Sequence, residues 1–297
     1  MNQASFWWPA AAVLCQWLFY LSLVACVGGA LSGHLLVKWS PRQSLYQRRC
    51  RHYVLTAVAI GLLAVVSGFF IQVGLMAGEG IVGMTNPMMR QIVWSSNVGE
   101  ASLLRGMGLL ALLVAFVGPL VTRIWWLRTG IWLVGVVALS YSLTLLGHLV
   151  NAPLWLKGAL LSHFLVAAWW LGSLIPLMMA CRTRPLNELK RQMVRFGQYA
   201  SGFMFILVAA GAVMAWSLLD LPQALWRTSY GLTLTVKLML LMAMLMLAAR
   251  HKWHLVPALS DEADSERLRR SIFLETLLAA LLLLATAVLT TVVGPNS

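Results

Sequence analysis

Long runs of apolar residues recur along this whole chain, and they constrain its fold more than any other feature. A helix needs about 20 mainly apolar residues to cross the hydrocarbon core of a membrane. Only 10% of the 297 residues are charged and 60% are hydrophobic, whereas a soluble domain carries about 25% charged residues. The chain is therefore predicted to be an all-α, polytopic membrane helical bundle.

About eight such segments are predicted, and they form a single integral membrane domain over residues 1–297. The first stretch, Met1 to Pro9, lacks the basic region of a cleaved signal peptide, so the first segment is expected to be a retained helix. The predicted segments are 11–37, 54–77, 101–121, 129–150, 156–180, 198–219, 229–249 and 271–293.

The charged residues are mostly basic, and 17 of the 22 lysines and arginines lie in four of the intervening loops. These loops are 38–53, 122–128, 181–197 and 250–270. All four fall on one side of an eight-span bundle, which the positive-inside rule places in the cytoplasm, so both termini are predicted to be periplasmic. The net charge of +13 follows from this topology. Because the basic residues form no stripe with interleaved aromatics, nucleic acid is not an expected partner.

The familiar signatures of soluble catalysis are missing from the sequence. It contains no P-loop, no GxGxxG after a strand, no GxSxG and no HExxH. The loops are also too short to hold the large cytoplasmic domain that an ATP-driven pump requires. The sequence therefore indicates a protein that is not an enzyme, uses no nucleotide, and acts within the lipid bilayer and at its outer face.

Two histidines flank the short Asn-Ala-Pro turn between the fourth and fifth segments, on the outer side. Ionisable residues at membrane depth cost roughly 2.5 kcal/mol or more each, and this makes His148 and His163 the main candidates for function. The helical rise separates their depths by roughly 10 Å. They are therefore interpreted as two successive metal stations on an entry path rather than one closed site. Two histidines hydrogen-bonded to neighbouring helices are the structural alternative.

Methionines form a second pattern. The outer loop 78–100 contains Met84, Met88 and Met89 in a glycine-rich context. Thioether sulfur binds Cu(I) well, so a flexible loop of this kind suits the capture of a soft ion. Methionines that simply fill gaps are the alternative. The seventh segment carries a further stripe on one helix face, which packing explains at least as well as conduction: Met239, Met242 and Met246.

Three further ionisable residues lie at membrane depth. Lys237 is roughly 12 Å from the outer face and Glu275 roughly 6 Å from the inner face, which is too far apart for a direct pair. Each is expected to need its own partner or a water-filled cavity. His34, near the inner end of the first segment, is a candidate exit ligand, with a packed histidine as the alternative.

Other polar residues have structural explanations. Asn97 and Glu100 fit a capping box that opens the third segment. Arg105, one turn further on, is expected to snorkel outward. His251 and His254, in the stretch RHKWH, are expected to form a solvated cluster on the basic side, with receipt of an exported ion as the alternative.

Several stretches follow one another in an order found in a known family. They are GHLVN…LLSHFLVAAWWLGSL, RFGQYASGFMFILVAAGAV, TSYGLTLTVKLMLLMAMLMLAAR and a glutamate that opens the last helix. Together they resemble the CopD/PcoD family of bacterial inner-membrane copper homeostasis and resistance proteins. The resemblance spans most of the chain and is strongest from about residue 140 to the end.

The resemblance implies a multi-pass protein of the bacterial inner membrane that moves copper, as Cu(I) or Cu(II), from the periplasm toward the cytoplasm. It also implies a separate periplasmic copper-binding partner of the CopC type. His148 and His163 match the family's two histidines around the outer turn, which implies metal binding there. Tyr230 and Lys237 match the signature of the seventh segment, and Glu275 matches the acid of the last helix, as pathway residues.

Two other functions are open at this point. A b-type membrane cytochrome would need histidines that face one another across a haem iron at matched depth, and His148 and His163 are mismatched unless the turn between them lies flat. A non-transporting membrane anchor for a copper chaperone would bind its partner and move no copper.

Overall fold

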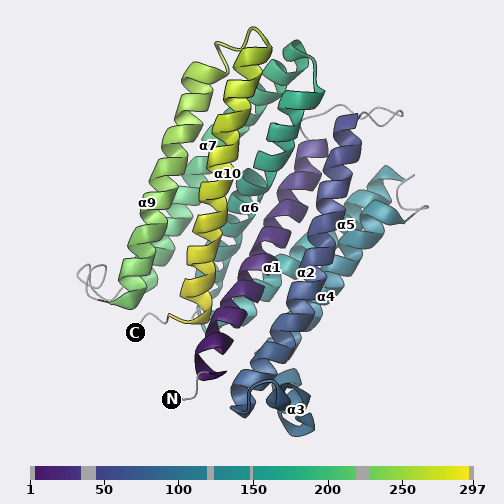
Figure 1. Cartoon of the computed structure of the whole chain (residues 1–297), viewed down its shortest axis with the longest axis vertical. Helices are drawn as coiled ribbons and strands as arrows, with labels where there is room; N and C mark the ends of the chain where they lie inside the picture. Colours follow the sequence, from purple (N-terminus) through teal and green to yellow (C-terminus); the bar gives the residue numbers. More distant parts are fainter. Residues whose placement is uncertain (1–3, 35–44, 119–123, 148–149, 219–227, 294–297) are drawn as a thin grey trace.

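The computed structural model describes residues 4–34, 45–118, 124–147, 150–218 and 228–293, and every regular element in these ranges is helical (Figure 1). Eight of the described helices are long and apolar enough to cross a membrane, which confirms the predicted all-α fold. They are α1 (Ala4–His34), α2 (Leu45–Ala77), α4 (Asn97–Val117), α5 (Trp125–Tyr141, continued by the 3-10 turn η2, Ser142–Leu145), α6 (Leu154–Thr183), α7 (Leu186–Leu218), α9 (Ser229–Arg250) and α10 (Glu262–Thr291).

Three helices begin well before their predicted apolar segments. α2 starts at Leu45 instead of residue 54, α7 at Leu186 instead of 198, and α10 at Glu262 instead of 271. The added turns carry eight of the chain's 17 arginines, which are good helix formers. A count of apolar residues finds only the part of a helix that crosses the hydrocarbon, so it misses these charged turns.

The helix termini and the connections between helices lie at two opposite ends of the bundle. Figure 1 shows the start of α1, the end of α10 and the short helix α3 (Pro87–Trp94) at one end, called here the α3 end. The turn between α6 and α7 and the connection from α9 to α10 lie at the other, called here the basic end. The described parts of all four basic clusters flank the basic end, as the charge alternation predicts. Which end faces the cytoplasm stays a prediction.

Helix α1 occupies the middle of the bundle and packs on α2, α6 and α10. It crosses α6 so closely that a Cβ atom on Gly28 or Gly172 would collide with the backbone of the other helix. Beside this crossing, Ser32 Oγ donates a hydrogen bond to Ser173 Oγ over 2.9 Å. Small residues and buried hydroxyls of this kind hold helices together in membranes, where apolar burial alone gives little association.

The segment predicted as a flexible outer loop is instead folded. It forms the 3-10 turn η1 (Val82–Thr85) and α3, which pack against α2. The Asn86 side chain caps α3 by accepting hydrogen bonds from the backbone N–H groups of Met88 and Met89. Ser96, and not Asn97, caps α4 by accepting from Val98 N. The predicted capping box is therefore wrong by one position, because a serine one residue earlier takes the cap.

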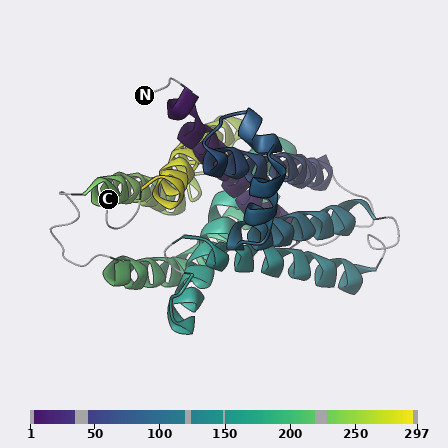
Figure 2. The ribbon, with the colours of Figure 1, turned by 90° about the horizontal axis from the view of Figure 1, so that it is seen from below.

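Helices α7 and α9 diverge toward the α3 end. α7 packs mainly on α6, and α9 mainly on α10. Figure 2, which views the molecule from below, shows α7 and α9 apart, with α9 beside the yellow α10. They are tied together near the basic end, where Lys252 Nζ donates to Ser201 Oγ of α7 over 2.6 Å.

Candidate metal site

His163 lies on α6, nine residues after the helix starts at Leu154, which is about 13 Å along its axis. Its Nδ1 is 2.8 Å from the carbonyl oxygen of Leu207 on α7. A carbonyl can only accept, so Nδ1 carries the proton and Nε2 keeps its lone pair. Metal-binding histidines are held in this way, with the second ring nitrogen donating to a fixed oxygen.

Gly211 on α7 makes room for this ring. A Cβ atom at that position would lie 3.0 Å from His163 Cε1 and 3.2 Å from Nδ1, tighter than almost all real contacts. The glycine lies one turn beyond Leu207, the residue that accepts the hydrogen bond. The stretch FILVAAGAV therefore supplies both the acceptor and the space that fix the imidazole.

Lys237 of α9 lies at the depth of His163. It is eight residues beyond Ser229, about 12 Å from the α3-end start of its helix, and close enough to the imidazole for their charges to interact. Within the described ranges, no hydrogen bond or ion pair to its half-buried ammonium is found. As expected, it makes no direct pair with Glu275, so a positive charge stands beside the candidate ligand.

Glu275 has a different partner, at the basic side of the bundle. It is 1% exposed, and its Oε2 lies 3.2 Å from Nδ1 of His251. The other ring nitrogen of His251 is 2.8 Å from Ser271 Oγ on α10. The expected solvated histidine cluster is therefore half wrong: His254 is exposed, whereas His251 points into the bundle.

Arg105 does not snorkel outward as expected. Only 8% of it is exposed, and its guanidinium lies 4.2 Å from the ring centroid of Phe19. It donates to Ser142 Oγ over 3.3 Å and to Gln16 Oε1 over 3.4 Å. Neutral partners on two elements, α1 and η2, stabilise the guanidinium inside the bundle, which removes the need to reach the surface.

Two of the predicted histidines lie outside the part of the chain that the structure describes. His148 is outside the described residues, and so is the side chain of His34 at the end of α1. Tyr230 is described: it is 7% exposed in the first turn of α9, which Thr228 caps by accepting from Gly231 N over 2.9 Å.

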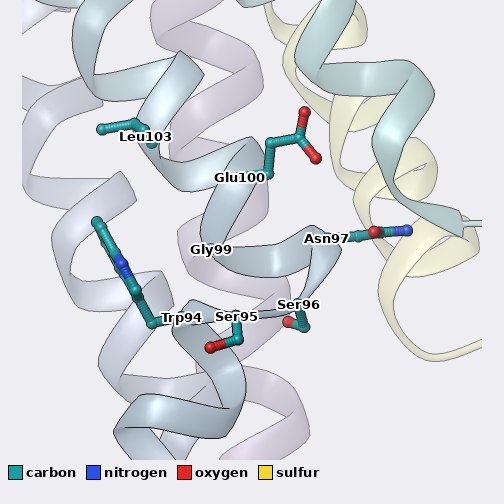
Figure 3. A pocket seen from close by; sticks show the side chains of 7 residues that line it. All are labelled: Trp94, Ser95, Ser96, Asn97, Gly99, Glu100 and Leu103. Carbon is teal, nitrogen blue, oxygen red and sulfur yellow. The ribbon is translucent and has the colours of Figure 1, made fainter.

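The methionines of the α3 end do not converge on one point. Met84 packs back onto Gly74 of α2, Met88 is 67% exposed, and Met89 is half-buried one position further along α3. A pocket of about 230 Å³ lies next to α3, between Trp94 and Glu100. In Figure 3 the Glu100 carboxylate points away from the Trp94 ring. The pocket has no sulfur or imidazole in its lining, so it offers a soft metal ion no ligand.

The methionine stripe of α9 faces out of the bundle. Its three members are more than half exposed, and the buried methionine of this helix is Met244. Neither packing in the core nor a path inside the bundle explains the stripe: Met239, Met242 and Met246. In the described part of the chain, no group of three or more His, Cys, Asp or Glu side chains is placed to hold a metal.

The fold and these sites define a polytopic membrane protein that buries ionisable groups, one of them an imidazole with a free lone pair. Two family models match the chain: "Copper resistance protein D-like, N-terminal domain" over residues 3–157 and "Copper resistance protein D" over residues 190–289. The chain therefore belongs to the copper resistance protein D family, which confirms the resemblance found in the sequence. This family of membrane proteins is generally considered non-enzymatic.

The inner membrane protein YebZ of Escherichia coli strain K12 is 26% identical over 262 residues, which cover 84% of this chain and 86% of that protein. No solved structure matches the chain. The relative and the eight membrane-length helices together confirm the predicted inner-membrane location.

Proposed function

We propose that this protein moves copper through the inner membrane, from the periplasm toward the cytoplasm, as its contribution to copper resistance. The single observation that carries the proposal is the His163 imidazole. Leu207 and Gly211 of α7 hold the ring, and its Nε2 lone pair is left for a metal. Imidazole binds both oxidation states of copper, so Cu(I) and Cu(II) are both suitable cargo.

The proposed topology assigns the entry and exit faces for this movement. The positive-inside rule assigns the basic end to the cytoplasm and the α3 end to the periplasm. His163 is then in the outer part of the bundle, and His148, three residues before the Asn-Ala-Pro turn, is the ligand that meets copper first. A separate copper-binding protein of the CopC type is the proposed donor at the α3 end.

Lys237 keeps the copper affinity of this site low enough for transport. An ion has to bind well enough to enter and loosely enough to leave. A positive charge beside His163 lowers the affinity of the imidazole for a copper cation. We infer that Lys237 keeps copper from being trapped at the first intramembrane ligand.

Copper accumulation in cells tests the proposal. Cells that express the wild-type protein are expected to accumulate more copper than cells without it, and the double variant His148→Ala/His163→Ala should lose this increment. His254→Ala, an exposed histidine at the basic end, is the matched control and should accumulate copper normally. Normal accumulation by the double variant at wild-type expression would sink the assignment.

The described structure gives the haem alternative no support. The other described histidines, His52, His251 and His254, lie toward the basic end of their elements, whereas His163 lies near the α3-end start of α6. The anchor alternative differs in its outcome, since an anchor would move no copper in liposomes.

A further inference from the structure

Glu275 has one carboxylate oxygen without a partner. The side chain is 1% exposed, and its Oε1 makes no hydrogen bond to any described residue. An unpaired oxygen of a buried carboxylate is expensive, because burial removes water and nothing replaces it. Such an atom calls for a ligand, and its negative charge calls for a cation.

The many arginines of the basic end do not satisfy this oxygen. Arg269 and Arg270, on the same helix, both bind the carboxylate of Glu266 instead, and Arg267 binds Asp264 over 3.0 Å. Among the described residues, His251 is the one ion-pair partner of Glu275. The acids in the first turns of α10 thus hold the arginines away from it.

The backbone directs His251 toward Glu275. α9 continues into a π-helical turn, η4 (His251–Leu255), in which Val256 N donates to His251 O over 2.9 Å. π-helical turns insert an extra residue into a helix and occur frequently at functional sites. In this turn the His251 side chain is 13% exposed, so most of it is buried in the bundle and a small part stays accessible from outside.

A column of side chains on α9 leads from the level of His163 to His251. Tyr230, Lys237, Met244 and His251 follow one another at intervals of seven residues, which is close to two full helical turns. They therefore lie along one face, at steps of about 10 Å. Met244 is 0% exposed, so the thioether in this column is buried within the bundle.

We propose that Glu275 and His251 form a second copper-binding site, on the basic side of the bundle, which receives the ion after it leaves His163. This inference rests on the proposed transport function. Copper would take the place of the proton between Nδ1 of His251 and the Glu275 carboxylate. The proton of the neutral ring is then on Nε2, which donates a hydrogen bond to Ser271 Oγ, 2.8 Å away, and this bond fixes the ring. Met244 supplies a soft donor between the two sites.

The chemistry of the two sites suits movement in one direction. His163 stands beside a cationic ammonium, whereas His251 stands beside a carboxylate. A copper cation is repelled at the first site and attracted at the second, and both contain imidazole. Transfer from His163 to His251 is therefore downhill in electrostatic energy.

Copper binding by the purified full-length protein in detergent tests this site. The double variant His148→Ala/His163→Ala removes the proposed outer ligands, and Cu(I) is supplied as its complex with a chromogenic cuprous chelator. In that background we expect Glu275→Gln and His251→Ala each to weaken the remaining copper binding by about 10-fold or more. Ser271→Ala is expected to weaken it by about 10-fold, as for other residues that orient a ligand.

Two comparisons keep the result interpretable. His254 is an exposed histidine three residues from His251. The His254→Ala substitution should therefore leave the copper affinity of the background variant unchanged. Circular dichroism and gel filtration identify variants that fail to fold. Glu275→Gln keeps the shape of the side chain, so its copper affinity decides whether the inner site exists. Unchanged affinity in a folded Glu275→Gln variant would overturn the inner site. It would leave the proposed function standing, since that function is judged on copper movement through His163.

Discussion

At the scale of single residues, His163 and Lys237 have opposite effects on the affinity for a copper ion. The imidazole is fixed through Leu207 O, while the neighbouring ammonium opposes any cation bound to it. The sequence alone marked both residues as costly at membrane depth. It could not show that their charges interact, because they are 74 positions apart and the depth of each helix is set by packing.

Gly211→Ala is predicted to impair the site without touching a ligand. The new methyl group would lie within about 3 Å of the imidazole, so the ring must move and its hydrogen bond to Leu207 weakens. Loss of such an orienting contact typically lowers metal affinity by about 10-fold or more, which copper titration of the purified protein measures. Gly202→Ala is the matched control, since a Cβ atom there meets nothing within 4 Å. Equal affinities in the two variants would contradict the role of Gly211.

Lys237→Gln is predicted to tighten copper binding at His163 and to slow its release. The substitution removes the positive charge and keeps a polar side chain of similar reach. Stopped-flow transfer of copper from the loaded protein to a chelator should therefore be several-fold slower than in the wild type. Release at the wild-type rate or faster would show that the ammonium does not oppose the bound ion.

At the scale of the helices, the contact between α1 and α6 determines how the pathway helices are placed. Gly28 and Gly172 let the two backbones touch, and Ser32 and Ser173 join across the contact. Each glycine is unremarkable in the sequence, since the chain contains 23 of them. Periodicity locates apolar helices, but it does not identify which small residues bring two of them together.

Gly172→Ala is predicted to destabilise the bundle, because the methyl group meets the backbone of α1 and no rotamer can relieve the contact. Overpacking of this kind costs typically about 1–3 kcal/mol. Thermal unfolding in detergent should show a lower midpoint for this variant. Gly158→Ala on the same helix, where a Cβ atom meets nothing within 4 Å, should unfold like the wild type. A normal midpoint for Gly172→Ala would mean that the two helices are not held at this crossing.

Helix types and numbers were predictable, and helix ends were not. Apolar runs of membrane length predicted all eight spans, because lipid imposes one strong requirement on every one of them. The ends were misjudged where arginine-rich turns extend α2, α7 and α10. The pairing of His251 with Glu275 was also missed. Its signal in the sequence is the seven-residue spacing of Tyr230, Lys237, Met244 and His251, which has meaning only once one face of α9 is known to be buried.

At the scale of the whole molecule, the fold gathers the described parts of the basic clusters at one end of the bundle, so the basic end and the α3 end differ in charge. The proposed topology predicts that a cysteine introduced at the exposed Ser95, at the α3 end, reacts with a membrane-impermeant thiol reagent in intact spheroplasts. A cysteine at the exposed Asn187, near the basic end, should react only after the membrane is broken. The reverse pattern would invert the topology and, with it, the proposed direction of transport.

The central claim is that copper crosses the membrane through this chain by way of His163. Copper flux into proteoliposomes that contain only the purified protein tests it most directly, because no other uptake route or partner is present. Wild-type protein and His254→Ala are predicted to admit copper at equal rates, and His163→Ala at the rate of protein-free liposomes. Wild-type flux through a folded His163→Ala protein, or no flux through the wild type, would contradict the account.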